Sequence, residues 1–222
     1  MVAIDLPAHG ESEASSLDPP GFAADLAALF DELGLNAPAI VGHSVGGWTA
    51  LELAKLRRAG AVLALAPAGL WSEHSPLMTD IGLQVNWRLG QILGGLIDHS
   101  LKTRIGRSMG LRSVSVRAGQ IPYDTALAAA HDAVASQHFL AHFKATRILR
   151  FTGGRTIPSS TPVRVVWGDK DRVALKRRSR HTDELPDHAT FETWPDCGHM
   201  VMWDRTEDTI TAALKTAPSR RG

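Results

Sequence analysis

The chain has little cysteine, almost no excess charge and no long hydrophobic run. Its single cysteine, Cys197, excludes an intrachain disulfide and favours a reducing compartment, and we interpret it as a packed thiol. A formal net charge of +1 over 222 residues argues against electrostatic binding to nucleic acid. The longest apolar stretch, residues 60–71, is too short to cross a bilayer, and the first residues do not resemble a signal peptide. These absences predict a cytoplasmic protein that binds neither nucleic acid nor membranes.

The sequence also lacks the common motifs for phosphate and metal binding. It contains no Gly-x-x-x-x-Gly-Lys-Ser/Thr, and the glycines near residue 45 do not fit Gly-x-Gly-x-x-Gly. No His-x-x-x-His or Cys-x-x-Cys pair is accompanied by a third metal ligand. The basic run Lys176–Arg178 with Arg180 is expected to form a solvated helix face. We therefore expect neither a cofactor nor a metal.

A Gly-x-Ser-x-Gly segment stands between a predicted strand and a predicted helix. The apolar run 39–41 ends at Gly42, and a helical pattern follows the serine closely. A strand–turn–helix of this kind presents its central residue, Ser44, in a strained conformation at the carboxyl end of the strand. We expect side chains at Gly42 and Gly46 to collide with the neighbouring strand and helix, and Gly47 to permit close helix–sheet packing. A flexible turn is the alternative interpretation.

Strand and helix patterns alternate on both sides of a region without strand signals. The expected strands are 2–4, 39–41, 61–66, 163–167 and 190–194; the expected helices between them are 22–33, 48–57, 173–185 and 204–215, the last with Ile210, Ala213 and Leu214 facing inward. From 71 to 157 helical pieces appear, chiefly 83–97 and 125–149. The prediction is an α/β fold: a mostly parallel sheet with flanking helices from residues 1–70 and 158–222, and a helical cap insert over 71–157.

A serine nucleophile needs a base, and His199 is the best placed of the ten histidines. It follows the last predicted strand, as Ser44 follows an earlier one, and sites in parallel sheets lie at such carboxyl ends. Asp169 and Asp171 both follow the strand 163–167, and either could orient the imidazole and stabilise its protonated form. The order Ser, Asp, His, each just past a strand, is the order found in the α/β-hydrolase sheet.

These segments resemble the α/β-hydrolase fold superfamily, specifically its capped, esterase-like members. The matching motifs are Asp-Leu-Pro-Ala-His-Gly-Glu-Ser at 5–12, Gly-His-Ser-Val-Gly-Gly at 42–47, Trp-Gly-Asp-Lys-Asp-Arg-Val at 167–173 and Cys-Gly-His at 197–199. The resemblance implies that Asp171 rather than Asp169 is the acid, and that the Val45 amide is the first oxyanion donor. It also implies a mainly structural loop at Asp5 and His9.

The front of the chain departs from the family pattern. Members usually carry further strands before the segment 5–12, and a His-Gly loop among them supplies the second oxyanion amide. Without these strands we expect either a gap in the sheet or a forced re-pairing of residues 2–4 with 39–41. The loss of one oxyanion donor typically lowers turnover by about 10²–10³-fold. A mis-assigned start or a truncated chain is the preferred interpretation.

We therefore expect a serine hydrolase of carboxylic esters or related small acyl compounds, which uses Ser44, Asp171 and His199 and forms an acyl-enzyme. Residues expected to contact the substrate are His43, Trp71 and Met200. The same triad allows a C–C bond hydrolase, a lactonase or a perhydrolase. Dehalogenase and epoxide-hydrolase relatives carry Asp at the nucleophile position, which disfavours their chemistry here. A catalytically impaired or ligand-binding module is the non-enzymatic alternative, and a homo-oligomer is a possible assembly.

Overall fold

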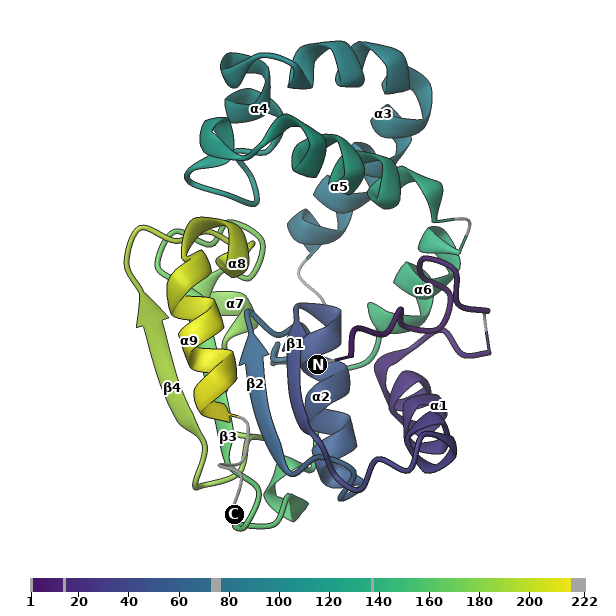
Figure 1. Cartoon of the computed structure of the whole chain (residues 1–222), viewed down its shortest axis with the longest axis vertical. Helices are drawn as coiled ribbons and strands as arrows, with labels where there is room; N and C mark the ends of the chain where they lie inside the picture. Colours follow the sequence, from purple (N-terminus) through teal and green to yellow (C-terminus); the bar gives the residue numbers. More distant parts are fainter. Residues whose placement is uncertain (1, 14, 73–76, 137, 217–222) are drawn as a thin grey trace.

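Four parallel strands form one sheet in the order β1–β2–β3–β4 (Figure 1). The computed structural model describes residues 2–13, 15–72, 77–136 and 138–216, with the backbone alone for 77–80. The strands are β1 (Ala39–His43), β2 (Ala61–Leu65), β3 (Val163–Gly168) and β4 (Thr190–Trp194). The predicted fold class, α/β with a parallel sheet and flanking helices, is confirmed.

Strand β2 is the buried centre of the sheet. It pairs in parallel with β1 and β3, with Leu63 opposite Val41 and Arg164, and all five of its residues are buried. A parallel strand that is covered on both faces consists of continuous apolar residues, which is why β2 was recognisable from the sequence. Strand β4 lies at an edge, and its Phe191 is exposed.

Helices α1 (Pro19–Glu32), α2 (Val45–Lys55) and α9 (Thr206–Thr216) flank the sheet. The predicted inward face of α9 is wrong for Ile210 and Leu214, which are 54% and 71% exposed, whereas Ala213 is partly buried against the core. Thr209 and Ala212 are buried instead. The predicted helix 204–215 corresponds to α9, and Arg205 separates it from the short α8 (Val201–Asp204). The small side chains of Thr209 and Ala212 let α9 lie close to the sheet.

The described residues between β2 and β3 contain helices and no strand. They form α3 (Leu77–Leu101), α4 (Arg104–Gly110), η1 (Ala118–Gln120), α5 (Tyr123–Ala135), α6 (Phe139–Thr146) and η2 (Gly154–Thr156). Helices α3, α4 and α5 form a layer beyond one end of the sheet, and α6 returns towards α1 (Figure 1). We call residues 77–156 the helical region; its status as a separate cap domain stays a prediction. No described helix is long and apolar enough to span a membrane.

Two expected elements are absent or shortened. Residues 2–6 have no regular secondary structure, Val2 is 66% exposed, and no described strand pairs with the outer edge of β1. The predicted strand 2–4 is therefore wrong, since so short a segment gains few ladder hydrogen bonds for the entropy lost on fixing it. The predicted helix 173–185 is reduced to α7 (Lys176–Ser179). The Asp171 side chain accepts from the amides of Val173 and Ala174, and the Arg180 side chain donates to the Ala174 carbonyl. These bonds compete with helix formation before Lys176.

Candidate active site

Ser44 lies at the turn between β1 and α2 in a conformation that is rare for a residue with a side chain. Its φ and ψ are 51° and −116°. The Ser44 amide donates to the Leu65 carbonyl (2.9 Å), and the Ser44 carbonyl accepts from the amides of Trp48 (3.1 Å) and Ala68 (3.0 Å). These bonds to β2, α2 and the following loop hold the strained backbone in place, as is common at functional sites.

The glycines of this turn differ in what they permit. A Cβ at Gly42 would lie 2.1 Å from the Gly46 carbonyl oxygen, so the predicted collision at this position is confirmed. A Cβ at Gly47 would lie 3.1 Å from Pro67 Cβ, in agreement with close packing of the helix on the sheet. At Gly46 no described atom lies within 4 Å of the Cβ position, so the predicted collision there is wrong.

The structure brings the three candidate catalytic side chains together at the carboxyl ends of β1, β3 and β4. The distance between Ser44 Oγ and His199 Nε2 is 3.2 Å, and the distance between His199 Nδ1 and Asp171 Oδ2 is 3.0 Å. Because the carboxylate accepts a hydrogen bond from Nδ1–H, the Nε2 lone pair is directed to the serine hydroxyl, which donates to it. Both His199 and Asp171 are buried.

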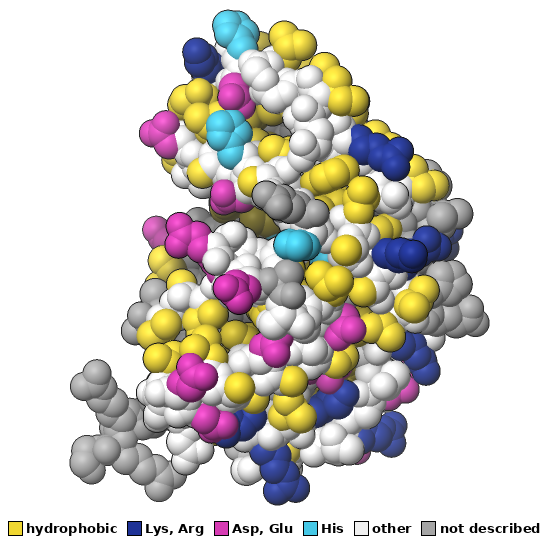
Figure 2. Space-filling model, turned by 90° about the vertical axis from the view of Figure 1, so that its right-hand side faces the viewer, with side chains coloured by type: hydrophobic (Ala, Val, Ile, Leu, Met, Phe, Trp, Pro, Cys, Tyr) yellow, Lys and Arg dark blue, Asp and Glu magenta, His cyan; other side chains and the backbone are white. Residues whose placement is uncertain are grey.

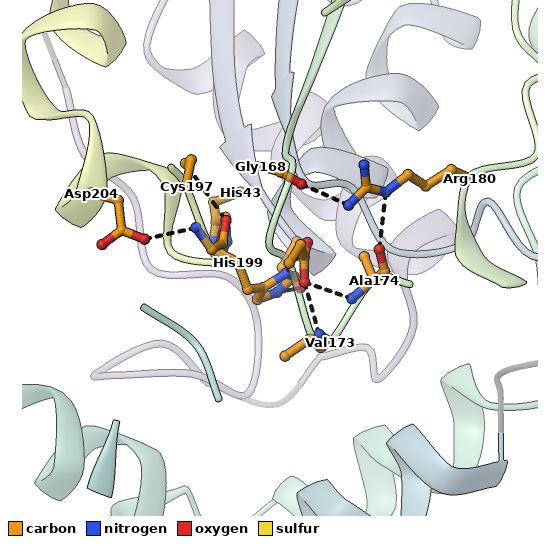
Figure 3. A network of polar contacts seen from close by, with 11 residues as sticks. His43, Gly168, Val173, Ala174, Arg180, Cys197, His199 and Asp204 are labelled. Atoms are coloured by element: carbon orange, nitrogen blue, oxygen red, sulfur yellow. Dashed lines mark hydrogen bonds and ion pairs between the residues drawn. The ribbon is translucent and has the colours of Figure 1, made fainter. Parts of the chain in front are cut away.

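Asp171, and not Asp169, is the carboxylate that contacts the histidine. Burial raises the pKa of Asp171, but hydrogen bonds from His199 and from the amides of Val173 and Ala174 (both 2.8 Å) outweigh this, so its pKa lies below the ordinary value (Figure 3). The carboxylate is therefore ionised near neutral pH and able to stabilise an imidazolium. Asp169 is exposed and accepts from the Cys197 amide (3.1 Å).

A cavity of about 270 Å³ opens at Ser44 and His199. Its walls are mostly apolar and come from both the sheet loops and the helical region. The lining includes Trp71, Leu83, Phe139, His142, Phe143 and Val173. Figure 2 shows a recess where the upper helical layer meets the lower part of the molecule. A mostly apolar pocket beside a hydroxyl–imidazole pair is suited to a small organic substrate.

The profile of the alpha/beta hydrolase family matches residues 1–213. The chain belongs to this family. The hydrolase is 27% identical over 202 residues to the epoxide hydrolase EphH of Mycobacterium tuberculosis. This match covers 83% of this chain and 89% of that protein. It is also 27% identical over 227 residues to the dihydrolipoyllysine-residue acetyltransferase component of the acetoin cleaving system of Cupriavidus necator; the match covers 97% of this chain and 55% of that protein.

Solved structures share the fold of this hydrolase at lower sequence identity. A membrane phospholipase A gives a TM-score of 0.66 at 22% identity, with 95% of this chain and 68% of that chain covered. The meta-cleavage product hydrolase from Pseudomonas fluorescens IP01 gives 0.65 at 16% identity, with 95% and 76% covered. At such identities the likeness concerns the fold.

The three residues expected to contact the substrate lie in different places in the hydrolase. Trp71 lines the cavity, and its Nε1 donates to the Leu149 carbonyl (2.7 Å). His43 and Met200 are not among the lining residues; His43 Nε2 donates to the His199 carbonyl (2.9 Å). Burial and the neighbouring His199 lower the pKa of His43 to about 3, so His43 is a neutral, fixed donor behind the base. The substrate-contacting roles stay predictions.

Sequence reasoning assigned no cavity role to His9 and His142, because these two rings are far apart in the chain and only the fold brings them together. His142 Nδ1 hydrogen-bonds the Leu17 carbonyl (2.8 Å), and His9 Nδ1 hydrogen-bonds the Pro7 carbonyl (2.9 Å). The two rings lie 5.2 Å apart, and burial lowers the pKa of His142. Since a neutral ring that donates through Nδ1 keeps an acceptor at Nε2, His142 adds polar character to one wall of the cavity.

Arg180 braces the loop that carries the acid. Its guanidinium donates to the carbonyls of Gly168 (2.8 Å) and Ala174 (3.0 Å; Figure 3). It also lies over the Trp167 ring, 5.5 Å from the centroid. Lys176–Arg178 is exposed, as expected of a solvated face, whereas Arg180 is not part of that face.

Elsewhere in the site, burial raises the pKa of the Cys197 thiol to about 12, which agrees with a packed thiol rather than a reactive one.

Proposed function

We propose that this alpha/beta hydrolase is a serine hydrolase that cleaves carboxylic esters or related acyl compounds through an acyl-enzyme. The observation that carries the proposal is the hydrogen-bonded series Ser44–His199–Asp171 at the mouth of an apolar cavity. In such a series the base is adjacent to the nucleophile and is itself oriented by a third group.

The reaction follows from the positions of these groups. Ser44 Oγ attacks the acyl carbon while His199 Nε2 takes its proton, and the imidazolium is stabilised by Asp171. The same proton is then returned to the leaving alkoxide, so that an acyl-serine and an alcohol result. Water, deprotonated by His199, attacks the acyl-serine and releases the acid and the free hydroxyl.

The Val45 amide supports the developing oxyanion in this proposal. It is the first amide of α2, so no carbonyl of the helix accepts from it, and Val45 lines the cavity beside Ser44. The positive end of the α2 dipole adds to this stabilisation. A volume of about 270 Å³ lies near the lower bound for ligand sites, which favours compact acyl groups.

The main rivals differ in the bond that breaks. The similarity to EphH makes epoxide hydrolysis one rival. This chain has Ser44 and not an aspartate at the turn after β1, and a serine nucleophile favours acyl transfer. A ligand-binding module without turnover is the non-enzymatic rival. It is considered because the Val45 amide is the one oxyanion donor assigned here, and the loss of a second donor would lower turnover. C–C bond cleavage, lactone opening and perhydrolysis use the same three side chains.

A fluorophosphonate probe tests the proposal directly, since it labels activated serines. We expect the wild-type chain to be labelled and to hydrolyse p-nitrophenyl esters of short acids, with Ser44→Ala inactive in both assays. Styrene oxide and a C–C bond substrate complete the panel. Absence of labelling in a folded wild-type sample would contradict the proposal and favour the ligand-binding module; turnover of the epoxide that persists in Ser44→Ala would exclude Ser44 as the nucleophile.

A further inference from the structure

The loop that carries His199, here called the base loop, is hydrogen-bonded to the helical region on one side of the histidine and to α8 on the other. On one side, the Met200 amide donates to the Val114 carbonyl (2.8 Å). On the other side, the Gly198 amide donates to Asp204 Oδ2 (2.7 Å; Figure 3). A Cβ at Gly198 would lie 2.7 Å from the Val114 carbonyl oxygen, so the two backbones are in close contact.

Asp204, at the end of α8, joins this loop to the segment after α4. Its carboxylate is buried, with the residue 3% exposed, and it accepts four hydrogen bonds. Oδ2 accepts from the amides of Gly198 (2.7 Å) and Val116 (3.1 Å), and Oδ1 accepts from Ser115 Oγ (2.6 Å) and the Arg117 amide (3.1 Å). A buried carboxylate is stable when its lone pairs are filled in this way.

We call residues 112–117 the clasp segment. It contacts both the loop after β3 that carries Asp171, here called the acid loop, and the base loop that carries His199. The Arg112 carbonyl accepts from Arg172 Nη1 (2.9 Å), next to the acid Asp171. Val114 contacts the base loop directly through the Met200 amide, and the three residues after it contact that loop through Asp204. One short segment of the helical region thus contacts both loops whose side chains meet at His199.

We propose that Asp204 is a positioning residue for His199. Through Asp204 and the clasp segment, the position of the helical region on the sheet would affect the distances from His199 to Ser44 and Asp171. This inference rests on the proposed function. A base that must stay 3.2 Å from Ser44 Oγ and 3.0 Å from Asp171 Oδ2 tolerates little displacement. A misplacement of about 1 Å can cost on the order of 100-fold in rate.

The decisive variant is Asp204→Asn, which keeps the shape of the side chain. In either orientation its NH₂ group faces a backbone amide donor that now lacks an acceptor: Gly198 and Val116 in one, Arg117 in the other. We expect kcat for an ester substrate and the rate of fluorophosphonate labelling to fall about 10–100-fold per folded molecule, with KM within about threefold.

A spectroscopic readout separates positioning from general destabilisation. The downfield proton resonance of the His199 Nδ1–H···Asp171 hydrogen bond is measured in each folded variant, independently of turnover. We expect this resonance to broaden or shift in Asp204→Asn. The matched control is Asp208→Asn, which removes an exposed carboxylate paired with Arg205 (2.6 Å) and is expected to retain wild-type kinetics and the wild-type resonance.

Ser115→Ala supplies a graded second test. It removes one of the four bonds to Asp204 and leaves the charge, so we expect a smaller fall in kcat in the same direction; it decides the matter if Asp204→Asn does not fold. Wild-type kcat together with an unchanged resonance in a folded Asp204→Asn, or in Ser115→Ala in its place, would overturn the inference. Absence of serine labelling in the wild type would instead reject the proposed function, and the resonance would still test the positioning of His199.

Discussion

The sheet and the helical region bury their apolar side chains to very different extents. In β2 every residue is buried, and Leu63 is fully inaccessible. In the helical region Ile92 is 77% exposed and Ile105 is 73% exposed. The apolar cluster that holds this region together is small; its buried members are Leu101, Ala118, Ile121 and Ala126.

This difference in burial corresponds to two requirements of an active site, namely fixed positions for the reacting groups and a cavity wall that can adapt to a substrate. The proposed reacting groups, Ser44, Asp171 and His199, all follow strands of the well-packed sheet, where close packing fixes their positions. The cavity walls come partly from the helical region, where few buried contacts predict a low free energy of local opening. A rigid set of reacting groups is thereby combined with a more adaptable wall, and the clasp segment joins the two.

The largest effect is expected at the acid that the sheet positions. Asp171→Asn should lower kcat by about 10⁴-fold, because the amide cannot fix the required tautomer or stabilise the imidazolium. Asp169→Asn, in the same loop, should leave kcat close to that of the wild type, since Asp169 does not contact His199. Ester hydrolysis by the two purified variants measures this, and equal losses in both would refute the assignment of the acid.

Truncation of an aliphatic side chain should affect the two regions unequally. Leu63→Ala leaves a cavity in the centre of the sheet and should lower the free energy of unfolding by about 2–5 kcal/mol. Ile92→Ala removes an exposed side chain and should change it by no more than about 0.5 kcal/mol. Urea denaturation provides the comparison; similar losses would mean that Ile92 is covered in solution.

Acid should destabilise the sheet side of the site through His43. The pKa of His43 is lowered from 6.5 to about 3 by burial and by His199, so between these values the unfolded chain binds more protons than the folded chain. The free energy of unfolding therefore falls as the pH drops through this window, by up to about 1.4 kcal/mol per pH unit from this group. In His43→Gln the slope should be smaller by about that amount. Denaturation series at pH 7, 6, 5 and 4 measure it, and identical slopes would contradict the burial of a neutral imidazole.

The smallest effect concerns glycines within helices. No described atom lies within 4 Å of a Cβ at Gly94, so Gly94→Ala should stabilise α3 by up to about 1 kcal/mol through lower backbone entropy in the unfolded state. Hydrogen exchange of the α3 amides should slow accordingly. Gly42→Ala is the contrasting variant, because its Cβ would meet the Gly46 carbonyl at 2.1 Å and disrupt the serine turn. Faster exchange in Gly94→Ala would show that the glycine is needed for packing.

The elements predicted well are those whose signal is local. The continuous apolar run of β2 and the Gly-x-Ser-x-Gly turn at Ser44 each follow from neighbouring residues. The helix expected at 125–149 is instead α5 and α6, because the chain leaves the helix between them, which an extrapolated periodicity does not foresee. In α9 two of the three residues expected to face inward are exposed, because contacts with the sheet and not the apolar pattern select the buried face. The strand expected at 2–4 failed for another reason: a strand exists through its partner, which local sequence does not contain.

By itself the sequence determined the fold class and the three side chains expected at the carboxyl ends of the strands, since strand patterns and the order of motifs are properties of the chain. The structure shows that Asp171, which the family resemblance favoured over Asp169, hydrogen-bonds His199. The tertiary structure alone decided that His9 and His142 line the cavity and that Asp204 joins the base loop to the clasp segment. The physical reason is that hydrogen bonds and burial depend on distances between residues far apart in the chain, and folding sets those distances.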